Sequence, residues 1–411
     1  MSNPTTQDTA AVGYGLIGAG AFGRYCLGRY ASLDGVKRVA VADASDTLAR
    51  QAAEAYGLEV CGVDELLARD DVELVHLATP PGTHKDLALR AIAAGKHVLC
   101  EKPLAVTVDD GRAMVDAAKA RGVNLAANLI MRHVPHCERV KAVLDTGLLG
   151  EPIHGEFING AKDQELGPDH WFWDPAKSGG IFIEHGVHFF DVFDWWLGTS
   201  DTNPRRPANR RGGVPTPEHG TPTLLHAHAG RRPRNPRIVE RVLATVRYGD
   251  PAAGVDVTFF HGFTQANVLD RQQWRIVCER GEIRMSQWVP DTLTVEGLMD
   301  EPGAAAIAHA MGGAAIQCVL PLPGDAGRLT ARHKAVAVDG RYTLDATDPR
   351  RKDELYGVAL RDLLADQARA LREPDHPRRL NESHAMRSLE LADAATRAAE
   401  AGGIAPTPPR S

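Results

Sequence analysis

A glycine-rich segment near the N-terminus has the residue types and spacing that bind a phosphate group. It reads Gly18-Ala19-Gly20-Ala21-Phe22-Gly23 and follows the apolar run Tyr14–Ile17. In a strand-turn-helix unit of this kind, Gly18 makes the tight turn, Gly20 lets the backbone approach a pyrophosphate, and Gly23 lets helix and strand pack closely. The positive end of the helix attracts the anion. We therefore predict that this segment, including Ala21 and Phe22, binds a dinucleotide.

A carboxylate about 20 residues beyond the last glycine supports this prediction. Asp43 ends the run Val39-Ala-Val-Ala-Asp43, where its side chain can accept hydrogen bonds from ribose hydroxyls. A carboxylate there repels a 2'-phosphate, and no arginine stands at the following Ala44 and Ser45. We therefore expect NAD, with NADP the less favoured cofactor. The alternative is that Asp43 only caps a helix that begins near Ser45.

The elements that must position these groups alternate along the first part of the chain. Short β-branched runs alternate with helical periods, which is typical of βαβ units and a parallel sheet. Strands are predicted at Tyr14–Ile17, Val36–Asp43, Val72–Ala78, His97–Cys100 and Val123–Ala127. Helices are predicted at Ala21–Ser32, Asp46–Tyr56, Val63–Arg69, Thr83–Ala94 and Thr107–Ala120. The pattern predicts an α/β protein whose residues 12–131 form an N-terminal Rossmann domain.

The pattern changes after about Arg132. Strand-like runs return at Ile153–Asn159, Arg237–Tyr248, Gly254–His261, Trp274–Cys278, Glu282–Ser286 and Thr292–Val295. Helices are predicted at His136–Leu144, Glu354–Leu371 and Glu382–Ala399. We expect residues 132–411 to form a C-terminal α+β domain with a mainly antiparallel open sheet. Residues 1–11 are expected to be a flexible tail, and 199–236 a Pro- and Arg-rich excursion.

Two further motifs resemble those of a known family. Thr79-Pro80-Pro81-Gly82-Thr83-His84 is followed by Glu101-Lys102-Pro103-Leu104, and the sequence resembles the glucose-fructose oxidoreductase/inositol dehydrogenase (Gfo/Idh/MocA) family. The resemblance implies that Thr79, Pro80, His84, Glu101 and Lys102 lie around the cofactor. A lysine just after a parallel strand stands at the edge where α/β sheets bind ligands. There it can polarise a carbonyl or stabilise a developing alkoxide.

The segment from Ser178 to Asp191 resembles the family's second signature, commonly G-G-G-x-x-x-D-x-G-x-H-x-x-D. The resemblance places His188 at the position of the catalytic histidine, and Glu184 stands where the aspartate is usual. Four residues apart on one helical face, Glu184 can orient His188. The hypothesis is reversible hydride transfer in which His188 takes the hydroxyl proton, Lys102 holds the same oxygen, and Glu184 tunes His188.

Several polar and aromatic residues are candidates for binding a sugar or polyol substrate. Aromatic faces beside a carboxylate suit such a ligand, although single aromatic residues are more often core. The candidates are Asn128, Arg132, Trp171, Trp173, Asp174 and His185.

Histidine pairs raise the question of a metal site. The pairs are His133 with His136, His185 with His188, and His226 with His228. Two of these histidines lie inside a signature that needs no metal, and another pair flanks Pro135. The six cysteines form no C-x-x-C pair, so we expect no metal site.

Composition narrows the partners. The formal net charge of -6 gives no support to a nucleic-acid or membrane-surface partner. The sequence shows no secretory signal and no run of about 18 apolar residues, so we expect a soluble, cytoplasmic protein. The family resemblance implies a homodimer or homotetramer. Two other functions stay open: an NAD-dependent glycosidase or epimerase that oxidises its sugar transiently, and a non-catalytic dinucleotide-binding sensor.

Overall fold

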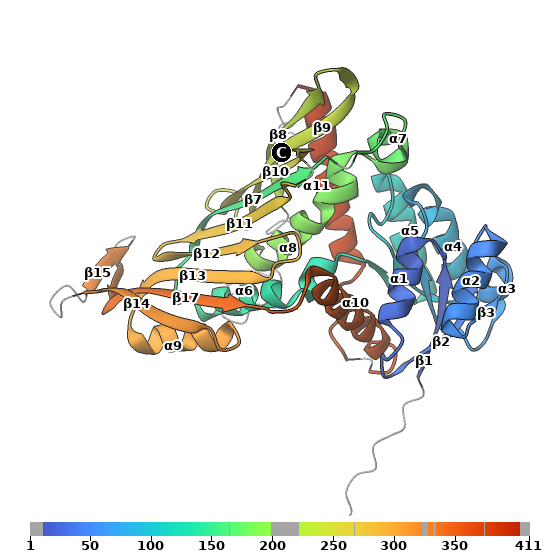
Figure 1. The fold of residues 1–411 in the computed structure, drawn as a ribbon, viewed down its shortest axis with the longest axis horizontal. Helices are drawn as coiled ribbons and strands as arrows, with labels where there is room; N and C mark the ends of the chain where they lie inside the picture. The colour runs from blue at the N-terminus through green and yellow to red at the C-terminus, as the bar shows by residue number, and fades with distance from the viewer. Residues whose placement is uncertain are drawn as a thin grey trace, which may run out of the picture. The chain divides into compact units, whose positions relative to one another are not determined.

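The computed structural model describes residues 11–163, 165–198, 222–266, 268–322, 328–331, 334–373 and 375–402. It divides into two compact units, whose elements Figure 1 labels. The first unit contains the described residues up to His133 together with Gly357–Leu389, and the second contains the rest. None of the helices in these described ranges is long and apolar enough to cross a membrane.

The division differs from the sequence expectation in two respects. We expected all residues after 131 to belong to the second domain, but the first unit extends to His133 and also includes Gly357–Leu389. Contacts with that unit explain the second difference. The Glu382 carboxylate accepts a hydrogen bond from the backbone N–H of Leu125 at 2.8 Å, and Arg372 forms an ion pair with Glu73 at 2.6 Å.

The first unit is a six-stranded parallel sheet in the order β3-β2-β1-β4-β5-β6. Its strands are β1 Val12–Ile17, β2 Val36–Ala42, β3 Glu59–Val60, β4 Leu74–Leu77, β5 His97–Cys100 and β6 Leu125–Ala127. Its helices include α1 Ala21–Arg29, α2 Asp46–Tyr56, α3 Val63–Ala68, α4 His84–Ala93 and α5 Val108–Arg121. This strand order is that of the Rossmann fold, as the sequence predicted.

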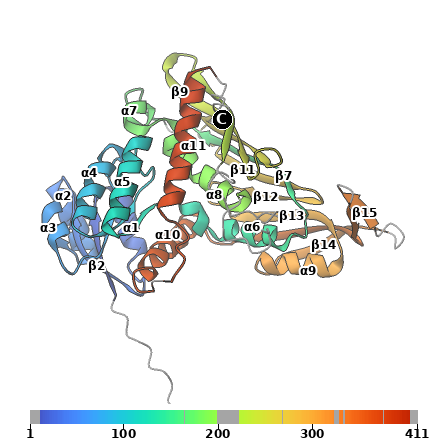
Figure 2. The same ribbon diagram turned by 180° about the vertical axis from the view of Figure 1, so that it is seen from behind.

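Local signals in the sequence set the ends of these helices. The Ser45 and Thr107 hydroxyls accept hydrogen bonds from the first turns of α2 and α5. Gly57 and Gly122 end the same helices in the left-handed conformation that glycine favours. Figure 1 shows α1 over one face of the sheet, and Figure 2 shows α4 and α5 over the other.

The second unit is built on a nine-stranded sheet in the order β14-β17-β13-β12-β11-β7-β10-β9-β8. Its strands are β7 Pro152–Lys162, β8 Thr223–Arg232, β9 Asn235–Tyr248, β10 Val255–Gln265, β11 Arg271–Cys278, β12 Gly281–Ser286, β13 Thr292–Met299, β14 Ala315–Pro321 and β17 Gly340–Thr347. Neighbouring strands are antiparallel except β7 and β10, so the predicted, mainly antiparallel sheet is confirmed. β15 Arg328–Ala331 and β16 Lys334–Ala337 form a separate two-stranded sheet.

Helices cover one face of this sheet. They include α6 Pro135–Thr146, α8 Val187–Leu197 and α9 Glu301–Ala310, and α7 Pro175–Ser178 is a single turn. Phe189 of α8 stacks on Phe157 of β7 with ring centroids 3.7 Å apart, which places the aromatic core between helix and sheet. The last helices are α10 Lys352–Arg369 and α11 Glu382–Glu400.

We expected an excursion without regular structure at 199–236, and this expectation is wrong for residues 222–236, the part that the structure describes. Residues 199–221, like residues 1–10 of the expected tail, lie outside the described residues. From Thr223 the chain forms β8, which pairs with β9. Sheet pairing satisfies the backbone of this polar segment without requiring an apolar run. The second unit also contains α9, β14 and β17, which were not predicted from the sequence.

Candidate functional site

The glycine turn has the geometry that its spacing predicts. Gly18 has a φ of +105°, and a Cβ there would lie 2.4 Å from the carbonyl oxygen of Ala78. A Cβ on Gly23 would lie 2.0 Å from the carbonyl oxygen of Gly18, so helix and turn pack too closely for any side chain. Gly20 has no atom within 4 Å of its Cβ position. The turn is therefore closed on the protein side and open at Gly20. Ala21 and Phe22 begin α1, with Phe22 stacked on Tyr25.

Asp43 connects this turn to the end of β2. One carboxylate oxygen accepts a hydrogen bond from the backbone N–H of Ala19 at 2.6 Å, and the other accepts one from the backbone N–H of Ser45 at 2.7 Å. The cap of α2 is Ser45, whose hydroxyl accepts from the N–H of Leu48. The suggestion that Asp43 is merely a helix cap is therefore not what the structure shows. Its carboxylate lies beside the glycine turn.

The turn after β4 is joined to the turn after β5 by His84. Its Nε2 lies 2.9 Å from the carbonyl oxygen of Thr79, and its Nδ1 lies 2.9 Å from that of Pro103. Burial lowers the pKa of His84, although these two bonds act in the opposite direction. A neutral imidazole has one N–H, so it donates to one of the two carbonyls at a time. The ring is fully buried and contacts protein groups, whereas the sequence placed it at the cofactor.

Glu101 and Lys102 follow β5, at the carboxyl ends of the parallel strands. Lys102 is half-buried, and Glu101 is 8% exposed. The Glu101 carboxylate accepts a hydrogen bond from Nδ2 of Asn128 at 2.8 Å and lies 3.0 Å from Nε2 of His76. Asn128, expected to contact substrate, is therefore bonded to the carboxylate next to Lys102.

Arg132 is also more enclosed than its expected role as a substrate ligand suggests. It is 3% exposed, and its guanidinium lies 3.5 Å from the carbonyl oxygen of Arg379. The Arg379 guanidinium donates in turn to the carbonyl oxygen of Arg132 at 3.0 Å. These reciprocal bonds attach Arg132 to Gly357–Leu389, the stretch that returns to the first unit.

The second signature begins with a turn and continues into α8. Gly179 and Gly180 have φ values of +78° and +87°, which explains the glycine pair. Phe182–Gly186 form one π-helical turn before α8 begins at Val187. We expected Glu184 and His188 on one α-helical face, and the wider π turn changes that spacing. Such turns are frequent at functional sites. Glu184 is half-buried and His188 is 2% exposed.

His185 is held by the protein at both ring nitrogens. The indole N–H of Trp288 donates to Nε2 at 3.1 Å, and Nδ1 lies 3.0 Å from Nδ1 of His261. Indole nitrogen only donates, so Nε2 of His185 is an acceptor and Nδ1 carries the proton. His185 therefore donates to His261, whose pKa burial lowers to about 3. Protein groups therefore hold the ring that we expected to contact substrate at both of its nitrogens.

Asn159 and Gln272, which were not predicted from the sequence as site residues, lie in line with His261 across the sheet. In the strand register, Asn159 of β7 lies beside His261 of β10 on one side and Gln272 of β11 on the other. All three are buried, although their strands are otherwise apolar on this face. A polar residue at a buried position of an alternating strand is the signal that could have found them.

The aromatic cluster expected to contact a sugar is divided between surface and core. Trp171 is 39% exposed, whereas Trp173 is 7% exposed and packs against Phe263 and the guanidinium of Arg232. Asp174 caps α7 by accepting from the N–H of Ala176 at 3.1 Å. The core alternative therefore describes Trp173.

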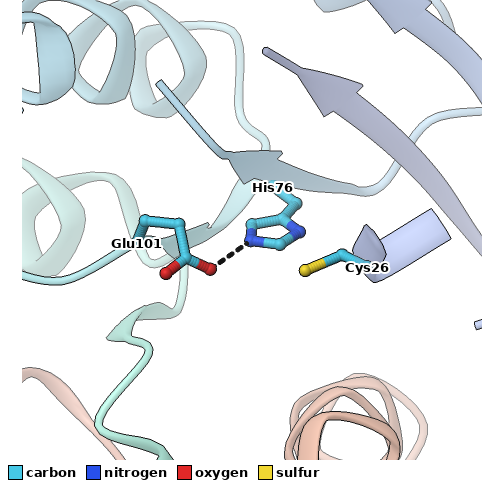
Figure 3. A group of neighbouring side chains, drawn as sticks. All are labelled: Cys26, His76 and Glu101. Carbon is cyan, nitrogen blue, oxygen red and sulfur yellow. Dashed lines mark hydrogen bonds and ion pairs between the residues drawn. The ribbon is translucent and has the colours of Figure 1, made fainter. Parts of the chain in front are cut away.

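Within the described ranges, one group of three His, Cys, Asp or Glu side chains has its ligand atoms together. These are Cys26, His76 and Glu101, whose atoms lie within 4.8 Å of one another (Figure 3). The group includes none of the three histidine pairs found in the sequence. It lies in the buried layer between the sheet and α1.

Comparisons with known proteins assign both halves of the chain to one family of oxidoreductases. Residues 12–129 match the model described as "Oxidoreductase family, NAD-binding Rossmann fold", and residues 141–406 match "Oxidoreductase family, C-terminal alpha/beta domain". The chain is 33% identical over 187 residues to inositol 2-dehydrogenase of Rhizobium meliloti, which is 46% of this chain and 55% of that one. It is 33% identical over 189 residues to 1,5-anhydro-D-fructose reductase of Ensifer adhaerens, which is 45% and 56%. The chain thus spans about half the length of the curated relatives it matches.

Solved structures share the fold over nearly the whole chain. Levoglucosan dehydrogenase in complex with NADH and L-sorbose is 18% identical with a TM-score of 0.69, covering 97% of this chain and 100% of that one. The WlbA dehydrogenase of Bordetella pertussis, in complex with NADH and UDP-GlcNAcA, is 19% identical with a TM-score of 0.72, covering 98% and 99%.

Proposed function

Because the chain belongs to the Gfo/Idh/MocA oxidoreductase family, we propose that it transfers a hydride between NAD and a secondary alcohol or ketone of a sugar, polyol or sugar derivative. The observation that carries the proposal is the Asp43 carboxylate, held 2.6 Å from the Ala19 N–H of an open glycine turn. This is where a dinucleotide's adenosine ribose is recognised in Rossmann folds. The relatives named for inositol and anhydrofructose support the substrate class.

The same carboxylate favours NAD over NADP. Asp43 is half-buried at the end of β2, where its negative charge opposes a 2'-phosphate. Ala44 and Ser45 follow it, and neither supplies a cation for that phosphate. We infer that NAD is the preferred cofactor.

Bound NAD supplies a hydride acceptor at its nicotinamide ring, and the chain supplies the charges and the proton acceptor. Lys102 follows β5 and its ammonium stabilises the negative charge that develops on the substrate oxygen. His188 takes the hydroxyl proton as general base, because an imidazole titrates near neutral pH. Glu184, in the π turn that leads into α8, is the carboxylate that we assign to orient His188. Trp171, the exposed aromatic residue of its cluster, is the member that we assign to the substrate.

A panel of neutral sugars, polyols and sugar acids, each tested with NAD and with NADP, checks this proposal. We expect the absorbance of NADH to rise when one or more of the polyols are oxidised. With NADP in place of NAD, we expect kcat/KM to be at least about tenfold lower. Lys102→Ala and His188→Ala are expected to lower kcat/KM by about 100-fold or more, the usual size of a lost acid-base group. Lys119→Ala and His309→Ala, which change exposed residues of the same types, are the matched controls.

Three outcomes would contradict the proposal in different ways. Full activity of Lys102→Ala and His188→Ala would show that these two residues do not have the catalytic roles assigned to them. NAD binding without turnover of any substrate would favour a sensor. Release of a hydrolysed or epimerised sugar without net NADH would favour the glycosidase or epimerase alternative.

A further inference from the structure

A line of four buried polar side chains runs under the turn that carries Lys102. The hydroxyl of Tyr14 in β1 lies 2.8 Å from Nδ1 of His76 in β4, and Nε2 of His76 lies 3.0 Å from the Glu101 carboxylate. Asn128, directly after β6, donates to the same carboxylate oxygen at 2.8 Å. Tyr14 and His76 are fully buried in strands that are otherwise apolar. Figure 3 shows the His76 and Glu101 side chains pointing toward one another.

The proton positions follow from the chemistry of each group. Burial, and then the neighbouring Cys26 and Glu101, raise the pKa of Tyr14 well above its ordinary value, so the phenol keeps its proton. The carboxylate end of the line accepts from the Asn128 amide. A phenol that keeps its proton can donate it to Nδ1 of His76. With Nδ1 as the acceptor, the N–H of the ring stands on Nε2, facing Glu101. Every donor in the line is directed toward the carboxylate.

We propose that His76 is a positioning residue that, fixed as its Nε2–H tautomer by Tyr14, holds Glu101 and thereby the backbone that carries Lys102. The Glu101 backbone N–H donates to the carbonyl oxygen of Leu77 at 2.9 Å, so the residue is fastened at both its main chain and its side chain. Lys102 is the next residue in the chain, so the position from which its side chain extends depends on how Glu101 is held. The inference rests on the proposed function of Lys102, because only then does its placement affect turnover.

A metal ion is the competing explanation of this cluster, because Cys26, His76 and Glu101 converge (Figure 3). Two observations favour the hydrogen-bonded line. His76 lies within hydrogen-bond distance of Glu101 at one ring nitrogen and of Tyr14 at the other, and Asn128 donates to the same Glu101 oxygen. Burial, followed by Glu101, raises the pKa of the Cys26 thiol well above its ordinary value, whereas a metal ligand must be the thiolate.

Matched substitutions at His76 separate positioning from mere packing. His76→Gln supplies an amide donor at about the place of Nε2, and His76→Leu supplies similar volume without a donor. Tyr14→Phe removes only the group that fixes the tautomer. Cys26→Ala is the control, since it alters the same buried layer and leaves the line intact. For each protein we would measure thermal stability, the Kd of NAD by calorimetry, and kcat and KM with the best substrate of the panel.

We expect His76→Leu to lower kcat about tenfold or more, with the Kd of NAD and the KM of the substrate within about threefold, because misplaced catalytic groups affect turnover most. His76→Gln and Cys26→Ala should stay within about threefold of the wild type, with Tyr14→Phe between them and His76→Leu. In the wild type, ¹⁵N NMR of the histidine rings should show protonated Nε2 and unprotonated Nδ1 at His76.

The proposal is overturned if His76→Leu turns over like the wild type, if His76→Gln fails as severely as His76→Leu, or if Nδ1 carries the proton. A stoichiometric metal ion in the purified protein, lost in Cys26→Ala, would also overturn it. If His76→Leu does not fold, the NMR result and Tyr14→Phe decide. Wild-type protein that binds NAD but turns over no substrate would refute the proposed function instead, and the tautomer result would still stand.

Discussion

Asp43 is the residue on which we propose that the choice between NAD and NADP depends. Its carboxylate accepts from Ala19 and Ser45, so it both shapes the glycine turn and places a negative charge at the end of β2. Asp43→Ala removes both effects, and we expect the Kd of NAD to rise about tenfold or more, as the loss of a charged hydrogen-bond acceptor implies. Asp43→Asn keeps a hydrogen-bond acceptor without the charge. It should mainly reduce the difference between the Kd of NAD and the Kd of NADP. Calorimetry with both cofactors measures this, with Asp46→Asn, an exposed neighbour, as the control. Unchanged affinities in Asp43→Ala would show that ribose recognition lies elsewhere.

At the scale of elements, the π turn Phe182–Gly186 is attached to the sheet through His185. The ring receives a hydrogen bond from Trp288 and donates one to His261. His185→Phe keeps a ring of similar size but leaves both partners without these bonds, so we expect the free energy of unfolding to fall by about 2–4 kcal/mol. Urea denaturation measures this change. His154→Phe, at an exposed position of β7, should change it by less than about 0.5 kcal/mol. Equal effects of the two substitutions would mean that the His185 bonds do not stabilise the turn.

At the scale of the whole molecule, buried histidines should make stability depend on pH. Burial is the largest cause of a lowered pKa at four histidines. It lowers the pKa of His84 and of His133, and it lowers that of His261 to about 3 and that of His384 to about 2. A folded-state pKa below the unfolded value of about 6.5 means that the unfolded chain binds more protons. The stabilisation is complete above about pH 6.5 and is lost as the pH falls toward these lowered values. We expect urea denaturation to show a clear loss of unfolding free energy between pH 7 and pH 5, before most carboxylates titrate. A flat profile over that range would contradict the neutral, buried state of these rings.

Much of the first unit could be predicted because its signals are local. Apolar runs, a capping serine and a following glycine fixed the prediction for α2, which the structure places at Asp46–Tyr56. The strand His97–Cys100 was likewise predicted with the bounds that the structure has. The glycine turn and Asp43 were found from spacing alone, because a βαβ unit brings its own turn and strand end together.

The sequence by itself therefore determined the fold class, the glycine turn and the family resemblance, which lies in the motifs that contain Lys102 and His188. Only the tertiary structure decided that Gly357–Leu389 belong to the first unit, that His84 joins two turns, and that His76 faces Glu101. The physical reason is range. Periodicity, caps and turns act over a few residues, whereas a buried hydrogen bond depends on which distant strands become neighbours. Tyr14 and His76 are 62 residues apart, and only the parallel pairing of β1 with β4 makes one the partner of the other.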